Sequence, residues 1–187
     1  MGLRGRSSVE EESFFFITTT VVKFQPIFTN SCYCDILIDN IRYYQQKYKF
    51  EILAYVIMPS HFHWIIEVDT STGTVSDIMR DIKKYTAWQI FEKVKLKGQT
   101  ELERIFREEA GVIVDQRMKL WMRRFDDEVI RNGRMFWNKL MYIHYNPVEA
   151  GIVLRAEDYK YSSARNYIHN DHSVIKINTE IGGIYTP

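Results

Sequence analysis

Two histidines lie one residue apart inside an apolar run of this 187-residue chain: His61 and His63, in the stretch YVIMPSHFHWIIEV. Successive side chains of a strand point to opposite faces, so both imidazoles would share one face while Phe62 points to the other. Two imidazoles on one face can bind one metal ion, and such a site needs a third ligand from elsewhere in the chain. The alternative is a pair of partly exposed polar residues at the start of a strand, each bonded to water or to the backbone.

A candidate third ligand lies in the later stretch RMFWNKLMYIHYN. At about 100° per residue, Phe136 and Ile143 fall within about 60° of Leu140 and would form the buried stripe of a helix. Tyr142 points about 200° away from Leu140, on the polar side that it shares with Asn146 four residues further on. Asn146 can offer a carbonyl oxygen to a metal, and Tyr142 can place a phenol oxygen beside it.

Tyr85 is the competing tyrosine. It lies at helical spacing from Ile78 and Ile82, which predicts that it packs into the core. With 12 tyrosines in the chain, a single tyrosine is most often structural. Tyr142 differs because it lies off the apolar stripe of its helix and next to an amide side chain.

The elements that would position these residues are visible as apolar runs and as apolar residues at helical spacing. Strands are predicted at residues 14–22, 50–57, 61–68 and 124–131. Helices are predicted at residues 35–50, 74–95 and 134–146, the last of them ended by Pro147. The charged residues 96–116 fit either a loop or a short helix.

This order predicts an α+β, ferredoxin-like (RRM-like) fold, with an antiparallel sheet and helices packed on one face. The hairpin of residues 50–57 and 61–68 is expected at the centre of the sheet, where a strand is a rigid support for a site. One domain is predicted over residues 13–170, after a disordered leader at 1–12 and before a C-terminal tail at 171–187.

The composition is that of an ordinary globular protein, with 45% hydrophobic residues, 26% charged residues and a net charge of +1. A charge so close to zero does not indicate a nucleic-acid partner, so such a surface would have to be a local patch. Cys32 and Cys34 are too close for an easy disulfide and too few for a thiolate zinc site, which predicts reduced thiols and a cytoplasmic protein. Neither a signal region nor an apolar run of membrane-spanning length occurs, so no membrane association is expected.

The stretches MPSHFHWII and YIHYNPVEAG together resemble the HUH-type single-tyrosine transposases, and among these the REP-associated tyrosine transposases and their insertion-sequence relatives. The histidine motif of that family corresponds to His61 and His63. Its tyrosine motif corresponds to Tyr142, Asn146 and Pro147. The resemblance covers roughly residues 14–167. One departure is Ser60, where the family usually carries asparagine. Because this residue only precedes the predicted ligands, the departure leaves the chemistry intact.

The resemblance implies cleavage of single-stranded DNA at hairpin-flanked sites. Tyr142 would attack a backbone phosphate, form a 5′-phosphotyrosine link and release a 3′-hydroxyl, and a 3′-hydroxyl could later rejoin a strand. A phenol, with a pKa near ~10, is a poor nucleophile without assistance. His61, His63 and Asn146 would hold a divalent metal, Mg²⁺ or Mn²⁺, that polarises the phosphate. No side chain is evident as a general base.

A basic segment from Arg117 to Lys139 is the predicted grip on the DNA, since cations suit phosphates and interleaved rings suit bases. The alternative is a solvated face whose aromatic residues enter the core, as expected for Trp137. Arg123 and Arg124 are the favoured DNA contacts. Further predicted contacts are Arg117, Lys119, Arg131, Lys83 and Lys84.

Three other functions compete with this one. A histidine-triad enzyme would need a third alternating histidine, and position 65 is Ile65. A relaxase shares the HUH chemistry but usually sits in a longer chain. A non-catalytic module that binds single-stranded nucleic acid, such as a domesticated transposase, needs no cleavage at all. Relatives occur as monomers and as homodimers, and the sequence leaves both states open.

Overall fold

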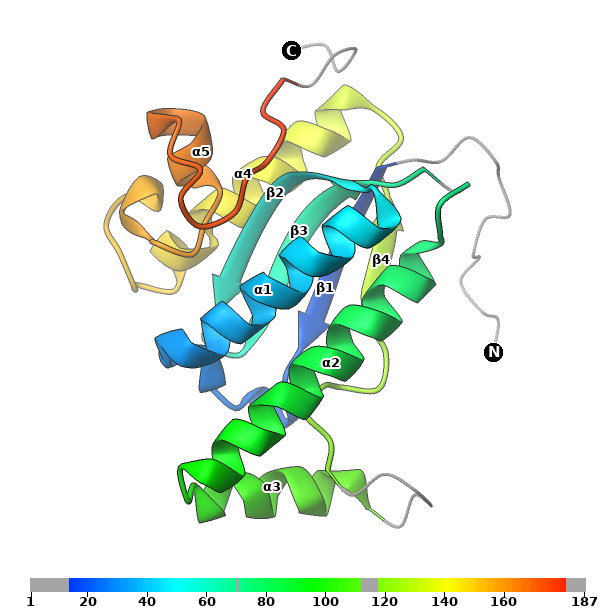
Figure 1. The fold of residues 1–187 in the computed structure, drawn as a ribbon. Coiled ribbons are helices and arrows are strands. Elements are labelled where there is room, and N and C mark those ends of the chain that lie inside the picture. The colour runs from blue at the N-terminus through cyan, green and yellow to red at the C-terminus, as the bar shows by residue number, and fades with distance from the viewer. Residues whose placement is uncertain (1–13, 70, 112–117, 181–187) are drawn as a thin grey trace, which may run out of the picture.

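Four antiparallel strands form one sheet in the order β2-β3-β1-β4 in this computed structural model, which describes residues 14–69, 71–111 and 118–180 (Figure 1). The strands are β1 (Phe14–Thr20), β2 (Glu51–Met58), β3 (His61–Glu67) and β4 (Asp126–Val129). The predicted strands and the ferredoxin-like order are confirmed. The hairpin was expected at the centre of the sheet, and this is wrong for β2. Because β1 pairs with the free side of β3, β3 is central and β2 lies at the edge.

The three predicted helices are present, and two further α-helices occur in the described residues. The α-helices are α1 (Ser31–Tyr48), α2 (Val75–Leu96), α3 (Thr100–Ala110), α4 (Gly133–Glu149) and α5 (Ala164–His169). Short 3-10 helices lie at Val22–Phe24, Ile27–Thr29 and Ala156–Asp158. The segment that fitted either a loop or a helix therefore contains a helix, α3. None of the helices in the described ranges is long and apolar enough to cross a membrane.

Helix α4 runs through Pro147 to Glu149, so the prediction that Pro147 ends it is wrong. A proline removes one backbone N–H from a helix, and this costs least near an end. Pro147 lies in the last turn, and the end is closed by hydrogen bonds from the Ala150 N–H to the Asn146 carbonyl (3.0 Å) and from the Gly151 N–H to the Val148 carbonyl (2.9 Å).

The two faces of the sheet carry different helices. Ile17 and Trp64 pack with α1 and α2, while Phe16 and Ile65 pack with α4 on the opposite face (Figure 1). The expectation that the helices lie on one face thus holds for α1 and α2 and is wrong for α4. The physical reason is that nearly every residue of β2 and β3 is buried. A sheet with two apolar faces needs cover on both sides.

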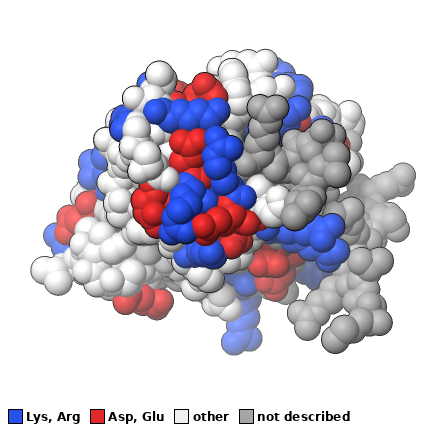
Figure 2. Space-filling view, turned by 90° about the horizontal axis from the view of Figure 1, so that it is seen from below, with Lys and Arg blue, Asp and Glu red and all other residues white. Residues whose placement is uncertain are grey.

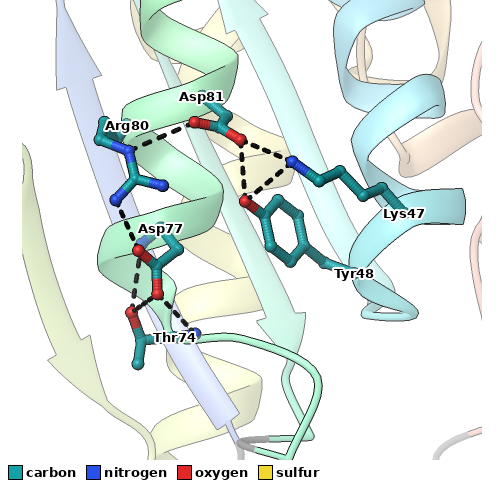
Figure 3. Close-up of polar contacts among 6 residues, drawn as sticks. All are labelled: Lys47, Tyr48, Thr74, Asp77, Arg80 and Asp81. Carbon is teal, nitrogen blue, oxygen red and sulfur yellow. Dashed lines mark hydrogen bonds and ion pairs between the residues drawn. The ribbon is translucent and has the colours of Figure 1, made fainter.

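The start of α2 is joined to the end of α1 by a polar network (Figure 3). Thr74 and Asp77 form the predicted capping box at the first turn of α2. One turn later, the Asp81 carboxylate accepts hydrogen bonds from the Tyr48 hydroxyl (2.8 Å) and from the Lys47 ammonium (3.0 Å). The network fixes the two helices that cover this face relative to each other.

Tyr85 does not lie in the core, contrary to the prediction, because 40% of its surface is exposed. The buried stripe of α2 continues at intervals of four residues through Ile78, Ile82, Thr86 and Ile90. Each such step turns the buried direction by about 40°, so the stripe has moved to Thr86 and Tyr85 lies about 100° away from it. Tyr85 instead contacts the ring of α1 residue Tyr44.

The exposed edge of β2 is covered by the segment between α4 and α5. The Ile57 N–H donates to the Tyr161 carbonyl (2.9 Å), and the Ser163 N–H donates to the Tyr55 carbonyl (2.9 Å). The Tyr159 hydroxyl donates to the Ile57 carbonyl (2.7 Å). These bonds occupy backbone groups that an edge strand would otherwise leave open to another chain.

The described part of the predicted tail, residues 171–180, packs on the α1 side of the sheet. Ile175 and Ile177 are buried in that core, and the Arg42 guanidinium donates to the Val174 carbonyl (2.6 Å). The predicted leader at residues 1–12 lies outside the described residues.

One buried side-chain pair ties α4 to the β2 edge. The Ser163 hydroxyl oxygen accepts a hydrogen bond from the Tyr55 N–H (3.0 Å) and lies 2.9 Å from His144 Nε2. Burial lowers the pKa of His144 to about 4, so the imidazole is neutral near pH 7 and Nε2 can accept the Ser163 proton. This bond links α4 to the segment that covers the β2 edge.

We expect Ser163→Ala to lower the free energy of unfolding by about 2 kcal/mol or more, because two buried groups lose a partner at about 1–3 kcal/mol each. As a control, Ser76 on α2 makes no side-chain hydrogen bond within the described part of the chain. Ser76→Ala should therefore stay within about 0.5 kcal/mol of the wild type. Urea denaturation followed by circular dichroism measures both variants, and equal midpoints would contradict the role given to Ser163.

Candidate functional site

The histidine pair faces α4, and strand alternation places it as predicted. His61 and His63 lie on one face of β3 with their ring centroids 4.8 Å apart. Phe62 points to the other face, into the core beneath α1 and α2. Across the sheet, His63 is paired with Thr18 and His61 with Thr20.

Tyr142 of α4 lies directly over His63. Its hydroxyl oxygen is 3.4 Å from His63 Nε2, and the two rings meet edge to face at 5.1 Å. Phe16 forms the floor of the site, since its ring stacks on His63 at 5.7 Å and meets Tyr142 at 6.0 Å. Tyr142 is 44% exposed, so the side chain that lies over His63 is also open to solvent.

A hydroxyl group lies against Nδ1 of each histidine. Thr18 Oγ1 is 2.7 Å from His63 Nδ1, and Ser60 Oγ is 3.2 Å from His61 Nδ1. When such a hydroxyl accepts the Nδ1 proton, Nε2 keeps the lone pair that a metal needs. The sequence alone did not identify Thr18, because only the register of β1 against β3 brings it to His63.

Both imidazoles are neutral near pH 7. Burial, together with the smaller effects of the nearby His61 and the Lys139 ammonium, lowers the pKa of His63 to about 3. Burial also lowers the pKa of His61. Neutral imidazole is the form that binds metals, so the histidine pair has the right charge state for a metal centre.

Asn146, the predicted third ligand, is half-buried one turn after Tyr142. Its side chain makes no hydrogen bond to any residue that the structure describes. The described residues contain no cluster of three or more His, Cys, Asp or Glu side chains that could hold a metal. A metal at the histidine pair would therefore take an amide oxygen such as that of Asn146, together with solvent or substrate oxygens.

An open hollow of about 430 Å³ adjoins Tyr142. It is lined by Asn132, Arg134, Met135, Asn138, Lys139 and Tyr142. Lys139 forms an ion pair with Glu128 (2.5 Å) and lies over the Phe16 ring at 4.5 Å. Arg134 belongs to the basic segment predicted to grip the DNA, but neither it nor Asn138 was singled out as a site residue. Asn138 lies four residues and Arg134 eight residues before Tyr142, and this helical spacing is a signal that could have identified them.

Arg123 and Arg124 are exposed in the segment that leads into β4. The Met122 N–H donates to the Thr20 carbonyl (2.8 Å), so this segment runs beside the end of β1 that pairs with His61. The two arginines therefore flank the histidine end of the sheet. Trp121 is buried and stacks on Phe28. Its ring therefore belongs to the core and is not available to stack on a base.

The other predicted DNA contacts are scattered. Lys119 is half-buried and Arg131 is exposed after β4, while Arg117 lies outside the described residues. Lys83 and Lys84 lie on α2, which covers the face opposite to α4, and the structure does not bring them together with Tyr142. Lys83 donates to the Met122 carbonyl (3.1 Å). Burial lowers the pKa of Lys83 to about 8, although the nearby Asp126 carboxylate acts to raise it. Lys84 lies over the ring of Tyr85.

Among the residues that the structure describes, the α3 end of the molecule shows no basic patch. Seen from below, Lys and Arg side chains lie interspersed with Asp and Glu side chains (Figure 2). On α3, Arg104 pairs with Glu101 (2.6 Å) and Arg107 pairs with Glu103 (2.5 Å). Charges that neutralise one another in this way offer little to a phosphate backbone.

Comparison with known proteins gives consistent results. Residues 16–109, half of the chain, match the family described as "Transposase IS200 like". This match includes His61 and His63 and ends before Tyr142. The chain is 29% identical over 118 residues to the "Putative REP-associated tyrosine transposase" of Haemophilus influenzae, covering 63% of this chain and 61% of that protein. It is 27% identical over 114 residues to the "REP-associated tyrosine transposase" of Escherichia coli K12, covering 61% of this chain and 54% of that protein. The chain thus spans less than two thirds of either relative.

A solved structure shares the fold over the whole chain. It is a REP-associated tyrosine transposase bound to a REP hairpin, with a TM-score of 0.65 and 20% sequence identity, covering 100% of this chain and 98% of that one. At this level of identity the likeness establishes the α+β fold and its four-stranded antiparallel sheet.

Proposed function

The chain belongs to the IS200-like transposase family. On this basis, we propose that it cleaves and rejoins single-stranded DNA with Tyr142 as the nucleophile. One observation carries this proposal: the exposed Tyr142 hydroxyl lies 3.4 Å from Nε2 of His63, on the face that also carries His61. A nucleophile and a pair of metal-binding side chains, contributed by distant parts of the chain, meet at one point of the surface.

In the proposed cleavage step, the Tyr142 oxygen attacks the phosphorus of a backbone phosphate. The Oη–P bond forms, the P–O3′ bond breaks, the phenol proton passes to solvent and the departing 3′-oxygen takes up a proton. The DNA stays bound through a 5′-phosphotyrosine link. Attack by another 3′-hydroxyl reverses these steps and rejoins a strand.

The residues present fit a divalent metal, Mg²⁺ or Mn²⁺. His61 and His63 would hold it through Nε2, since both are neutral and a hydroxyl lies against each Nδ1. Asn146 would add an amide oxygen from the helix that carries the nucleophile. A bound ion would polarise the scissile phosphate and offset its developing charge.

The substrate we propose is single-stranded DNA next to a hairpin. The solved relative of the same fold is bound to a REP hairpin, and cleavage by a tyrosine on a half-exposed helix needs an unpaired strand that can reach it. Arg123 and Arg124 support a strand that approaches along the histidine end of the sheet, because both are exposed beside the segment bonded to Thr20.

The test is to incubate the whole chain with hairpin-containing single-stranded DNA from the regions that flank its own gene, with Mg²⁺ or Mn²⁺. A covalent protein–DNA adduct that resists denaturation is the expected product, and chelation of the metal should prevent it. If no DNA gives an adduct but the same DNA is bound, the chain is a non-catalytic module that binds single-stranded nucleic acid.

Thr18 should position His63 for the metal. We expect Thr18→Val to weaken Mn²⁺ binding by about 10- to 100-fold, the usual effect of removing the partner that orients a histidine ligand. Thr18→Ser keeps a hydroxyl and should restore binding. The matched control is Thr20→Val, since Thr20 lies opposite His61 on the same face and its side chain bonds none of the described residues. Calorimetric titration with Mn²⁺ measures all three, and equal affinities for Thr18→Val and Thr20→Val would refute the role.

A further inference from the structure

The hollow beside Tyr142 has the size and the lining of a nucleotide site. Its volume is about 430 Å³ and its walls come from the first three turns of α4. Most of its lining residues carry a polar group, while Phe136 and Leu140 of the same helix belong to the apolar core.

Three of its residues form a row along the helix. Arg134, Asn138 and Tyr142 follow one another at intervals of four, and each interval advances about 6 Å along the axis and turns by about 40°. Arg134 therefore lies about 12 Å along the helix from the nucleophile, with Asn138 halfway. This spacing is comparable with that of successive phosphates in an extended strand, so neighbouring nucleotides can meet neighbouring members of the row.

The chemistry of the row suits a nucleotide. Arg134 is exposed and forms no ion pair with any residue in the described ranges, so its guanidinium remains to bind a phosphate. Asn138 is also exposed, and its amide can both donate to and accept from a base edge. Lys139 is already paired with Glu128, which leaves Arg134 as the cation of the hollow that has no carboxylate partner among these residues.

We propose that this hollow is a subsite for the nucleotides next to the cut, with Arg134 binding a neighbouring phosphate and Asn138 contacting a base edge. This inference rests on the proposed function, since it takes Tyr142 as the point of attack. It adds a binding site that determines where along a strand the enzyme cleaves.

The test removes one phosphate charge at a time. Each phosphate within three nucleotides of the cut is replaced in turn by a neutral methylphosphonate, and the rate of adduct formation is measured. For the wild type, one replacement should slow the reaction by about tenfold, the usual loss of a charged hydrogen bond. On normal DNA, Arg134→Gln should form the adduct about tenfold more slowly than the wild type. On the DNA with that same methylphosphonate, the rate of Arg134→Gln should fall by less than about a further twofold, because the arginine that would bind this phosphate is already absent.

The control for charge is Lys93→Gln. Lys93 is exposed on α2, on the opposite face of the sheet, and its variant should keep the wild-type response to every methylphosphonate. The subsite is refuted if every methylphosphonate slows adduct formation by Arg134→Gln as much as it slows adduct formation by the wild type. Asn138→Ala supplies a second test, because it should reduce the preference among the four bases at the neighbouring position, and an unchanged preference would overturn its role.

Failure of the subsite can be told apart from failure of the proposed function. If the wild type forms no adduct with normal DNA, the cleavage proposal fails, and the subsite is then tested by binding. Fluorescence anisotropy with single-stranded DNA should show that Arg134→Gln, and not Lys93→Gln, lowers the slope of log affinity against log salt by about one. Equal slopes for the two variants would overturn the subsite.

Discussion

Replacing Tyr142 by Phe is expected to abolish the covalent protein–DNA adduct, to below about one thousandth of the wild-type rate. The substitution removes the attacking oxygen and keeps the ring, so the contacts with Phe16 and His63 that hold this part of α4 remain. DNA binding and thermal stability should therefore stay close to those of the wild type. A denaturing gel with labelled single-stranded DNA measures the adduct, and anisotropy measures the binding.

The matched control is Tyr145→Phe. Tyr145 lies three residues further along the same helix and is 47% exposed, against 44% for Tyr142, but has no described contact with the histidines. Its variant should form the adduct at nearly the wild-type rate, as should Tyr85→Phe, whose tyrosine lies on the opposite side of the sheet. An adduct that persists in Tyr142→Phe and disappears in Tyr145→Phe would move the nucleophile to Tyr145.

The second large effect is expected from His61→Ala. Loss of one of the two imidazoles should reduce metal-dependent cleavage by at least about 100-fold, because the remaining ligands hold the ion too weakly at ordinary concentrations. DNA binding should change by less than about threefold, since His61 is neutral and contributes no charge to phosphate binding. His61 suits this test better than the buried His63, whose removal would also leave a cavity against Phe16.

His169→Ala is the control for the loss of a histidine, because His169 is exposed on α5, away from β3. Cleavage is measured over a titration of Mn²⁺, and Mn²⁺ binding is followed by the rise in melting temperature that it causes in the wild type. The ligand role would be wrong if His61→Ala required no more Mn²⁺ than His169→Ala for half-maximal cleavage.

The family relationship covers one half of the proposed centre. The matched residues 16–109 contain both histidines, whereas Tyr142 and Asn146 lie beyond them. The second half therefore depends on the geometry of α4, which places the Tyr142 oxygen 3.4 Å from His63. The same helix is also bonded to the β2 edge through His144 and Ser163 and packs on the sheet through Phe136, Leu140 and Ile143.

Local periodicity made much of the site predictable. Alternation along a strand put His61 and His63 on one face, because that relation holds for any strand whatever packs against it. Helical periodicity likewise separated the buried Phe136, Leu140 and Ile143 from the outward Tyr142, and all three stripe residues are buried. The order of strands and helices was sufficient for the fold class, because few topologies accommodate it, but it did not place β2 at the edge of the sheet or α4 on its second face.

Periodicity was misleading where burial depends on a neighbouring element. Tyr85 has the right spacing for the core of α2, but the stripe turns as the helix crosses the sheet and leaves this ring exposed. A proline such as Pro147 usually marks the end of a helix, yet α4 continues through it to Glu149. The exposure of Tyr85 depends on packing that a single segment does not encode, whereas Pro147 is tolerated because it lies in the last turn.

The sequence alone identified which residues could take part in the chemistry: two imidazoles on one face of a strand, and a phenol beside an amide on the polar side of a helix. That these two faces meet, and that burial keeps both imidazoles neutral, follows from the tertiary structure. It placed α4 on the side of the sheet opposite α1 and α2, brought Thr18 to His63 across the strand register, and opened the hollow beside Tyr142. The reason is physical: spacing along a chain sets the direction of each side chain within its own element, whereas contacts between elements follow from how buried faces pack against one another.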